Sequence, residues 1–374
     1  MHRQSKSTRA EFIDSAEKWL QSNVPARWRE NRGALSEEES TRIRREWDGK
    51  LFEAGFAGLS LPRIYGGQGL SLAEEVVFSE LSAQAKAPDG LARIGRILTA
   101  PTLIAHGSEA QLARYMPRIL NGDEIWCQGF SEPSAGSDLA GIACKATKVA
   151  GGYSVNGKKI WTSFAKIADR CLLLAQTQPD ATRYKNLSML LLDMKQPGVT
   201  IEPIKQISGL SHFAEVNFKD VFVAESDLVG EDGNGWKIAM TVLANERGGV
   251  EAASRYVEIR ADVDLLQMKI DAFPQYRKVL DNLDVRIELV RWQVKKAIDL
   301  EVDSIVFLEA VSILKILWSE LWQDIANLGL MMATAKDYEH WRFQYLETRA
   351  ASIYSGSNEI QRNIVSERIL GLPR

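Results

Sequence analysis

Ile353-Tyr354-Ser355-Gly356-Ser357-Asn358-Glu359-Ile360-Gln361-Arg362 is the most informative stretch of this 374-residue chain. A glycine stands between two serines, and amide and charged side chains follow where a helix is expected to begin. Such a segment can set backbone N–H groups and hydroxyls against a phosphate. The stretch therefore predicts a binding site for a phosphate-bearing ligand close to the C-terminus.

A second stretch, far upstream, is Trp126-Cys127-Gln128-Gly129-Phe130-Ser131-Glu132-Pro133-Ser134-Ala135-Gly136-Ser137-Asp138. By itself, this combination of proline, glycine and serine is typical of a polar loop. Together the two stretches resemble the acyl-CoA dehydrogenase family, whose members are flavoproteins that desaturate acyl thioesters between Cα and Cβ. The resemblance covers essentially the whole chain. Ser134 is a mild departure, because family members usually have glycine at that position.

The hydrophobic periodicity changes twice along the chain. Strand signals fill the middle: residues 171–175 and 189–193 are apolar runs of strand length, and residues 215–223 alternate apolar and polar. Asn156-Gly157, inside residues 153–161, predicts a strand–turn–strand hairpin. Helical spacing precedes and follows this region, in segments 8–21, 36–54, 71–86, 91–106, 108–120, 236–266, 274–301, 304–335 and 337–351, with a last helix from about 358.

Helices, strands and helices thus follow one another in blocks instead of alternating. We therefore predict an α+β fold that is mainly α. It comprises an N-terminal helical domain (1–122), a middle β-sheet or barrel-like domain (123–232) and a C-terminal helical-bundle domain (233–374). The family resemblance implies the same three-part layout.

The resemblance implies that the cofactor is FAD. In the family, the tryptophan at the Trp161 position packs against the flavin ring, and a nearby hydroxyl bonds to the ring edge; Thr162 and Ser163 both qualify. A flavin needs an apolar wall and a few donors, so these residue types suit the task, although tryptophan at a strand end is also common in cores. The FAD-binding residues implied are Gln128, Phe130, Ser131, Trp161, Thr162, Ser163, Ser355, Ser357, Glu359 and Gln361.

Glu246 is the predicted catalytic base. Many family members carry their catalytic glutamate directly after the tyrosine of the C-terminal motif, where this chain has Ser355. A minority place it on the first helix of the C-terminal domain, immediately before an arginine, as in Glu246-Arg247. A lone helical glutamate is usually solvated surface. However, the two glycines that follow cost about 1 kcal/mol each in a helix and indicate close packing or a ligand. A serine cannot replace the carboxylate without an activating partner.

The resemblance also assigns residues to the thioester substrate. The Ser137 position contacts the CoA chain, and Arg247, Tyr354 and Gly356 belong to the same group. In glutaryl-type relatives, an arginine from the region of residues 91–100 binds a distal substrate carboxylate. Arg96 is the candidate here. Its alternative interpretation is a solvated arginine, but if it faces inward, its buried charge requires an anionic partner.

The composition excludes several other classes of protein. A net charge of −3 gives no electrostatic case for nucleic-acid binding. The three scattered cysteines, Cys127, Cys144 and Cys171, indicate reduced buried thiols in a cytoplasmic protein. The four histidines show no metal-ligand spacing. Neither a secretory signal nor an apolar run of about 18 residues occurs, so no membrane span is expected.

The predicted partners are an acyl-CoA or acyl-carrier-protein thioester and an electron-transfer flavoprotein or similar acceptor. Two alternatives stay open. One is a flavin-dependent monooxygenase on the same fold, which Glu246 disfavours because those relatives lack a base. The other is a non-catalytic or half-active subunit of a heteromeric dehydrogenase, because the family's Phe-Gly element, which reaches a neighbouring subunit's flavin, is absent from residues 260–285.

A homo- or hetero-oligomer, either a dimer or a tetramer, is also expected. The family resemblance implies it, and one long apolar helix face supports it. Such a face packs against another helix, either within the chain or across a dimer. The residues of this face are Ile313, Leu314, Ile316, Leu317, Trp318, Leu321 and Trp322.

Overall fold

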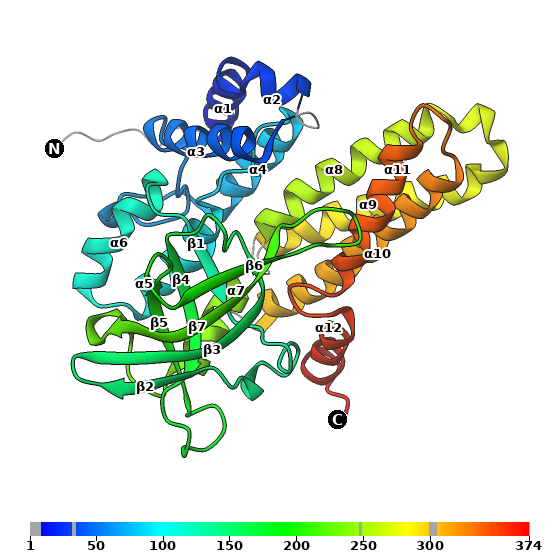
Figure 1. The fold of residues 1–374 in the computed structure, drawn as a ribbon. Coiled ribbons are helices and arrows are strands. Elements are labelled where there is room, and N and C mark those ends of the chain that lie inside the picture. The colour runs from blue at the N-terminus through cyan, green and yellow to red at the C-terminus, as the bar shows by residue number, and fades with distance from the viewer. Residues whose placement is uncertain (1–8, 32–34, 247–248, 299–304, 374) are drawn as a thin grey trace. The chain divides into compact units, whose positions relative to one another are not determined.

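The computed structural model describes residues 9–31, 35–246, 249–298 and 305–373. The chain forms two compact units (Figure 1). We call residues 41–69 and 89–246 the sheet unit, and the described residues of 1–40, 70–88 and 247–374 the helical unit. The predicted order of helices, then strands, then helices is confirmed. The three domain boundaries stay a prediction.

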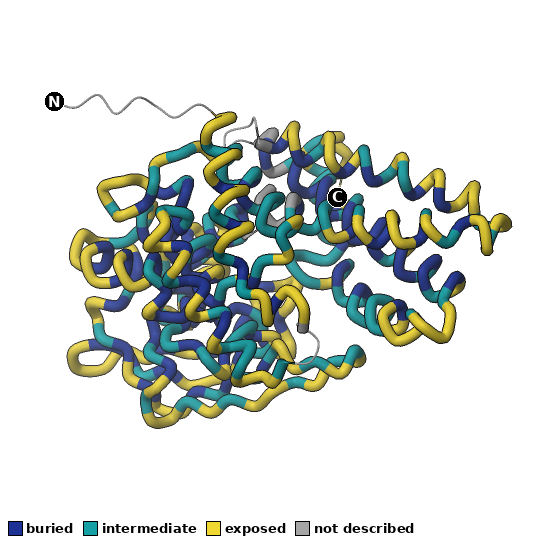
Figure 2. The backbone as a smooth tube through the Cα atoms, turned by 90° about the horizontal axis from the view of Figure 1, so that it is seen from above, coloured by how far each residue is buried: buried dark blue, intermediate teal, exposed yellow. Residues whose placement is uncertain are grey.

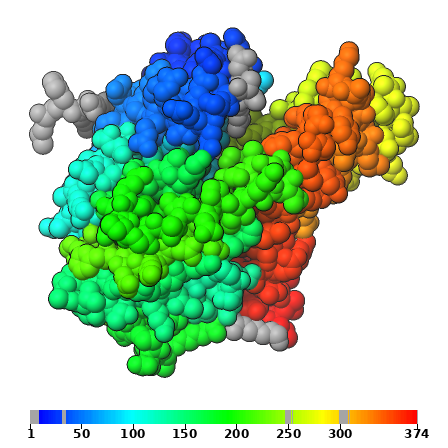
Figure 3. Space-filling model, in the orientation of Figure 1, coloured from blue at the N-terminus to red at the C-terminus, as the bar shows by residue number. Residues whose placement is uncertain are grey.

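One mixed sheet organises the sheet unit. Its strand order is β6-β7-β3-β2-β4-β5-β8, and β1 joins β4 in parallel. In the space-filling view, the green strand segments form one continuous surface (Figure 3). The strands are β1 (Trp126–Gly129), β2 (Lys145–Val149), β3 (Gly152–Ser163), β4 (Arg170–Gln176), β5 (Leu187–Asp193), β6 (Val199–Ile204), β7 (Phe213–Ala224) and β8 (Leu228–Val229).

β4 and β5 are buried on both faces, which is why their sequences are nearly continuous apolar runs. Leu172 and Leu174 pack into a core shared with helices, whereas Leu173 and Cys171 pack into a second core. Buried residues are dark blue in Figure 2. The helices of the first core are α5 (Ala100–His106), α6 (Glu109–Asn121) and α7 (Gly235–Glu246), together with the π-helical turn Gly95–Thr99.

The second core shows that the sheet curls over itself. Tyr153 of β3 and Phe218 of β7 belong to the same cluster as Leu190 and Leu192 of β5, although β5 neighbours neither strand in the sheet. Such a cluster forms when a sheet wraps around its own apolar face. The expectation of a barrel-like middle region is therefore confirmed.

The predicted hairpin at residues 153–161 is wrong. These residues lie in one continuous strand, β3. Its pairing with β7 shifts between Val155 and Gly157, where Lys219 and Asp220 of β7 stand opposite Asn156 alone, so the bulge lies in β7. A Cβ on Gly157 would lie 2.7 Å from the Cα of Cys144. The glycine is thus required by the close approach of a neighbouring backbone, not by a tight turn. The true hairpin joins β2 to β3, where Val149 pairs with Gly152.

The helical unit is built around the long helices that follow α7. Buried residues of α9 recur at a spacing of three and four, which gives a coiled-coil-like seam against α8 and α10. They are Leu280, Leu283, Ile287, Val290 and Val294. The helices are α1 (Arg9–Asn23), α2 (Ala26–Asn31), α4 (Leu72–Gln84), α8 (Gly249–Gln267), α9 (Arg277–Ile298), α10 (Ile305–Met331), α11 (Tyr338–Glu347) and α12 (Asn358–Ile364), while α3 (Glu37–Glu53) has residues in both units.

Helix boundaries differ from the predicted ones in two places. The predicted helix 236–266 covers α7 and α8, and the residues between them, 247–248, lie outside the described part of the chain. The segment 91–106 contains a π-helical turn before α5. The six-residue helix α2 was not predicted, because so short a segment offers little periodicity.

Candidate active site

Trp161 lies in a bulge of β3 and presents its indole to solvent. β3 pairs with β7 at Lys159–Val216 and again at Thr162–Ala214, so Ile160 and Trp161 together stand opposite a single residue of β7. Trp161 has a φ of 59° and is 55% exposed. A bulky residue in the left-handed region is costly and needs support from its surroundings. The bulge therefore holds a large flat apolar ring at the surface of the sheet unit.

Strand register distinguishes the two hydroxyls that follow Trp161. Ser163 pairs with Phe213, and directly paired residues of antiparallel strands share a face. The rings of Phe213 and Trp161 meet edge-on, with centroids 6.1 Å apart. Thr162 instead pairs with buried Ala214 and is itself buried. Ser163 is thus the hydroxyl on the face of Trp161.

The first motif is tied to this bulge by three hydrogen bonds. Ile160 N donates to Ser131 O at 2.9 Å. The Nζ of Lys159 donates to Phe130 O at 3.0 Å and to a carboxylate oxygen of Glu132 at 2.7 Å. Two segments about 30 residues apart in sequence thereby form one structural element in the sheet unit. We call this element the bulge platform: Phe130–Glu132 with Lys159–Ser163.

Two further predicted residues flank the bulge platform in sequence. Gln128 is half-buried in β1, opposite Leu172. A Cβ on Gly129 would lie 2.8 Å from the Sγ of Cys171, so only glycine allows β1 to approach β4 so closely. Ser137 is exposed on the loop after β1, next to Asp138, which forms an ion pair with Arg183.

The C-terminal motif forms a compact turn in the helical unit. Ser355 and Gly356 both have positive φ, 54° and 81°, so the chain reverses sharply before α12. Gln361 is fully buried, and its amide donates to Ser355 O at 3.1 Å. Ser357 caps α12, because its hydroxyl accepts a hydrogen bond from Ile360 N. The motif is therefore a turn held by its own side chains.

Neighbouring helices fix this turn in place. Asn358 is buried and accepts hydrogen bonds from the Nζ of Lys315 at 2.6 Å and from the hydroxyl of Ser319 at 3.1 Å, both on α10. The ring of Tyr354 lies 6.2 Å from that of Trp318 on the same helix. Glu359, by contrast, is exposed. The sequence did not predict the contact of Lys315 with this turn, because a lysine within a mainly apolar stretch of helix gives no signal of its partner.

α7 carries the predicted base. Its described residues run to Glu246, whose side chain lies outside the described structure, as does all of Arg247. One turn earlier, the hydroxyl of Thr241 lies 2.8 Å from the Nε2 of His106 on α5. The amide of Asn245 donates to Thr241 O at 2.9 Å. α5 therefore fixes the last turn of α7 within the sheet unit.

Arg96 does not have the environment that either interpretation expected. It is largely buried, and it pairs with the carboxylate of Asp48 at 2.7 Å. Its other hydrogen bonds go to the backbone oxygens of Asp48 and Leu120. Burial lowers the pKa of Arg96, and the neighbouring Asp48 opposes that shift. Because Asp48 already supplies the carboxylate, the geometry does not support a role in substrate binding.

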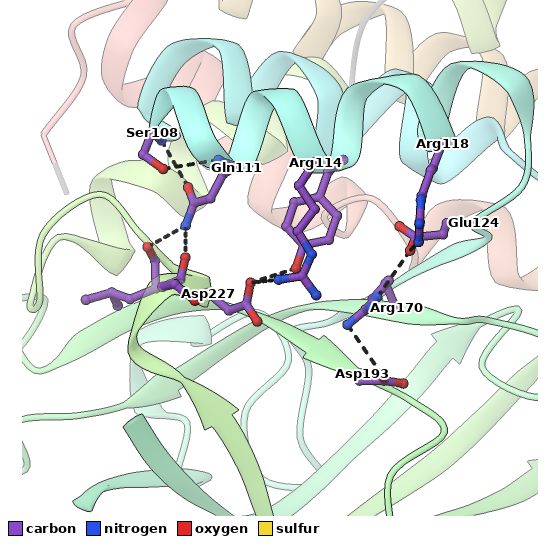
Figure 4. A network of polar contacts seen from close by, with 11 residues as sticks. Ser108, Gln111, Arg114, Arg118, Glu124, Arg170, Asp193 and Asp227 are labelled. Atoms are coloured by element: carbon purple, nitrogen blue, oxygen red, sulfur yellow. Dashed lines mark hydrogen bonds and ion pairs between the residues drawn. The ribbon is translucent and has the colours of Figure 1, made fainter. Parts of the chain in front are cut away.

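A network that the sequence did not predict holds α6 on the sheet (Figure 4). Gln111 donates to the backbone oxygens of Ser226 and Leu228 at 2.8 Å each. The hydroxyl of Tyr115 donates to Asp227 at 2.6 Å, and burial together with this bond raises the pKa of Tyr115. Further ion pairs join Arg114 to Asp227, Arg118 to Glu124, and Arg170 to Glu124 and Asp193. These contacts make one rigid scaffold of α6 and the strands.

The residues present fit a flavin. An exposed indole held in a bulge, with the Ser163 hydroxyl on the same face, offers the apolar wall and the donor that a flat heteroaromatic ring requires. In the described part of the chain, no cluster of His, Cys, Asp and Glu could hold a metal ion. All three cysteines are free and buried, as predicted.

Comparison with known proteins identifies the family. The models of the N-terminal, middle and C-terminal domains of acyl-CoA dehydrogenases match residues 6–123, 127–221 and 233–370. The chain belongs to the acyl-CoA dehydrogenase family. The fold is that of this family, with a sheet region between helical regions in sequence. No helix in the described residues has both the length and the apolar character needed to span a membrane.

Individual relatives match over nearly the whole chain. Acyl-CoA dehydrogenase IpdE1 of Mycobacterium tuberculosis is 37% identical over 381 residues, which covers 97% of this chain and 98% of the relative. IpdE1 of Mycolicibacterium smegmatis is 36% identical with the same coverage. Among solved structures, a variant of the Tcur3481-Tcur3483 steroid acyl-CoA dehydrogenase aligns with a TM-score of 0.82, at 25% identity and 98% coverage of both chains.

Proposed function

We propose that this protein catalyses the FAD-dependent α,β-dehydrogenation of an acyl thioester, borne by CoA or by an acyl-carrier protein. Membership of the acyl-CoA dehydrogenase family supports this class of reaction. The single observation that carries the proposal is the bulge platform, where Trp161 is exposed and shares a face with Ser163. A bulky residue held at positive φ with its ring exposed is a costly arrangement, and such strained positions cluster at functional sites.

Glu246 is the proposed base, which removes the α-proton of the thioester. A carboxylate positioned for this step contributes about 10²–10⁴ in rate. Glu246 lies on α7, and the contact between His106 and Thr241 fixes the preceding turn, so the backbone that carries the carboxylate is anchored. FAD would accept the hydride released from Cβ.

Ser355 occupies the alternative position of the base in the family, and we assign it a different task. A serine hydroxyl needs an adjacent base to act on a weakly acidic proton. Ser355 has a left-handed backbone and shapes the turn before α12. We propose that the turn and the start of α12 bind FAD through Ser355, Ser357, Glu359 and Gln361, in addition to Gln128, Phe130, Ser131, Trp161 and Ser163 of the sheet unit. Thr162, first considered with Ser163, is buried and is not part of this set.

The thioester would contact residues near both motifs. Ser137 is exposed on the loop after β1, where it is free of burial constraints and accessible to a pantetheine arm. Tyr354, Gly356 and Arg247 complete the proposed substrate set. An electron-transfer flavoprotein or a similar acceptor would regenerate the oxidised cofactor. Because the solved relative at 25% identity is described as a steroid enzyme, bulky polycyclic acyl groups belong among the candidate substrates.

A spectral assay tests the proposal. The purified protein, reconstituted with FAD where necessary, should be yellow and should bleach anaerobically when mixed with a suitable thioester. The panel would include short, branched, dicarboxylyl and steroid-derived acyl-CoAs and one acyl-carrier-protein thioester. A protein that binds no FAD by calorimetry would refute the enzyme assignment. Turnover that requires NADH-reduced flavin and oxygen would instead identify a monooxygenase.

A further inference from the structure

The bulge platform contains an ion pair that is shielded from water. Lys159 is 0% exposed, the side chain of Glu132 is 5% exposed, and their charged atoms lie 2.7 Å apart. Removing one partner from such a pair is strongly destabilising, whereas replacing both by apolar residues is often neutral. Stability alone therefore does not account for an ionic pair at this position.

The pair joins three segments of the sheet unit. The carboxylate of Glu132 also accepts hydrogen bonds from Ala143 N at 2.6 Å and Cys144 N at 3.0 Å, immediately before β2. The Nζ of Lys159 also donates to Phe130 O. The loop after β1, the approach to β2 and the middle of β3 are thus connected through two side chains.

The geometry of Trp161 depends on this connection. Ile160 N donates to Ser131 O, and this contact falls inside the bulge, between the β3–β7 pairs at Lys159 and Thr162. A bulge leaves its extra residue without a ladder partner, and a backbone donor that lacks a partner is costly. The loop supplies that partner only while Lys159 and Glu132 hold it against β3. The strained φ of Trp161 is therefore stabilised from outside the strand.

We propose that Lys159 and Glu132 are positioning residues that set the orientation of the Trp161 indole and the Ser163 hydroxyl, and through them the affinity for FAD. The link to FAD rests on the proposed function; the orientation of Trp161 does not. Neither side chain is exposed on the face of Trp161, so both residues act through the bulge and not by touching the cofactor.

The test uses Lys159→Met, Glu132→Gln and the double variant. Lys158→Met is the matched control, because Lys158 is the preceding residue of β3 and its ion pair with Glu215 is partly exposed. The orientation of Trp161 is measured without cofactor, as the 19F resonance of 5-fluorotryptophan protein, assigned by its loss in Trp161→Phe. FAD affinity is measured by titration, and folding by thermal melting.

Both single variants should melt at lower temperature, shift the Trp161 resonance and weaken FAD binding by about tenfold or more. The double variant should recover most of the melting temperature, because no unpaired charge remains, yet keep the altered resonance and the weak FAD binding. Lys158→Met should match the wild type in all three.

Three results would overturn the inference. The double variant could regain the native resonance and affinity, the single variants could keep both, or the resonance could move while the affinity of an FAD-binding protein stays unchanged. If the wild type binds no FAD, the proposed function fails by itself. The 19F resonance of Trp161 then still decides whether the ion pair sets its orientation.

Discussion

At the scale of single residues, Glu246 and Ser355 present the sharpest contrast. Glu246→Gln preserves size and removes the base, so we expect thioester-dependent bleaching to slow by about 10²–10⁴-fold while FAD stays bound. Ser355→Ala should cost far less, because Ser355 shapes a turn. Stopped-flow absorbance at the flavin band measures both. A near-native rate in Glu246→Gln, or an equal loss in Ser355→Ala, would move the base elsewhere.

Thr162 and Ser163 differ in which face of β3 they occupy, and hence in what they should do. The hydroxyl of Thr162 is buried and has no hydrogen-bond partner in the described structure. Because an unsatisfied buried hydroxyl costs about 1–3 kcal/mol, Thr162→Val should stabilise the protein by about 1 kcal/mol in urea unfolding. Ser163→Ala should instead perturb the flavin absorbance. Loss of FAD affinity in Thr162→Val would reverse the assignment.

Arg96 gives a prediction about stability, not selectivity. Arg96→Met would leave the fully buried carboxylate of Asp48 without its charge partner, so we expect a loss of about 3–5 kcal/mol in the free energy of unfolding. Arg93→Met, at an exposed position of the same segment, is the control. The ratio of rates for dicarboxylyl and plain acyl thioesters should not change. A selective loss of the dicarboxylyl substrate would restore the original hypothesis.

At the scale of elements, β3 shows where sequence patterns succeed and fail. The apolar runs of β4 and β5 were predictable because burial on both faces leaves only apolar residues. Asn156-Gly157 misled because this dipeptide is typical of tight turns, whereas here it continues β3 opposite a bulge in β7. The candidate site residues were assigned by resemblance, but the choice of Ser163 over Thr162 required strand register, which depends on a bulge that no local pattern specifies.

The contact between α8 and α11 should make stability depend on pH. The Nε2 of His340 lies 3.5 Å from Asp262, and this interaction raises the pKa of His340 above its usual 6.5. Asp337 also faces the imidazole and adds to the shift. Because the pKa of His340 is higher in the folded state than in the unfolded state, its contact with Asp262 stabilises the fold fully at pH values below the unfolded-state pKa. This stabilisation is lost as the pH rises through the folded-state pKa.

Melting temperatures of the wild type and His340→Gln test this expectation. The wild type should melt higher near pH 5.5, and the difference should shrink as the pH approaches about 9. A difference that is constant across this range, or that grows with pH, would show that the ion pair does not contribute.

At the scale of the whole molecule, the structure changes the basis of the expected oligomer. The apolar face predicted to mediate assembly lies on α10, and α8 and α9 of the same chain cover much of it. Its residues Leu314, Trp318, Leu321 and Trp322 are buried in the shared core. A different stripe is exposed. Val285, Leu289 and Trp292 of α9 are spaced by four and three residues, and they are 61%, 52% and 65% exposed.

We expect this α9 stripe to pack against the same stripe of a second copy. In an antiparallel, two-fold arrangement centred on Leu289, Val285 meets Trp292 of the other copy, and exposed Asp281 meets exposed Lys296 on both sides. Trp292→Glu should therefore convert the oligomer to a smaller species by light scattering at micromolar concentration. Met268→Glu, at a residue that is 76% exposed outside the stripe, is the control. A monomeric wild type would contradict assembly altogether. A carboxylate buried in this pairing could not be tolerated, so an oligomer that is unaffected by Trp292→Glu would place the contact elsewhere.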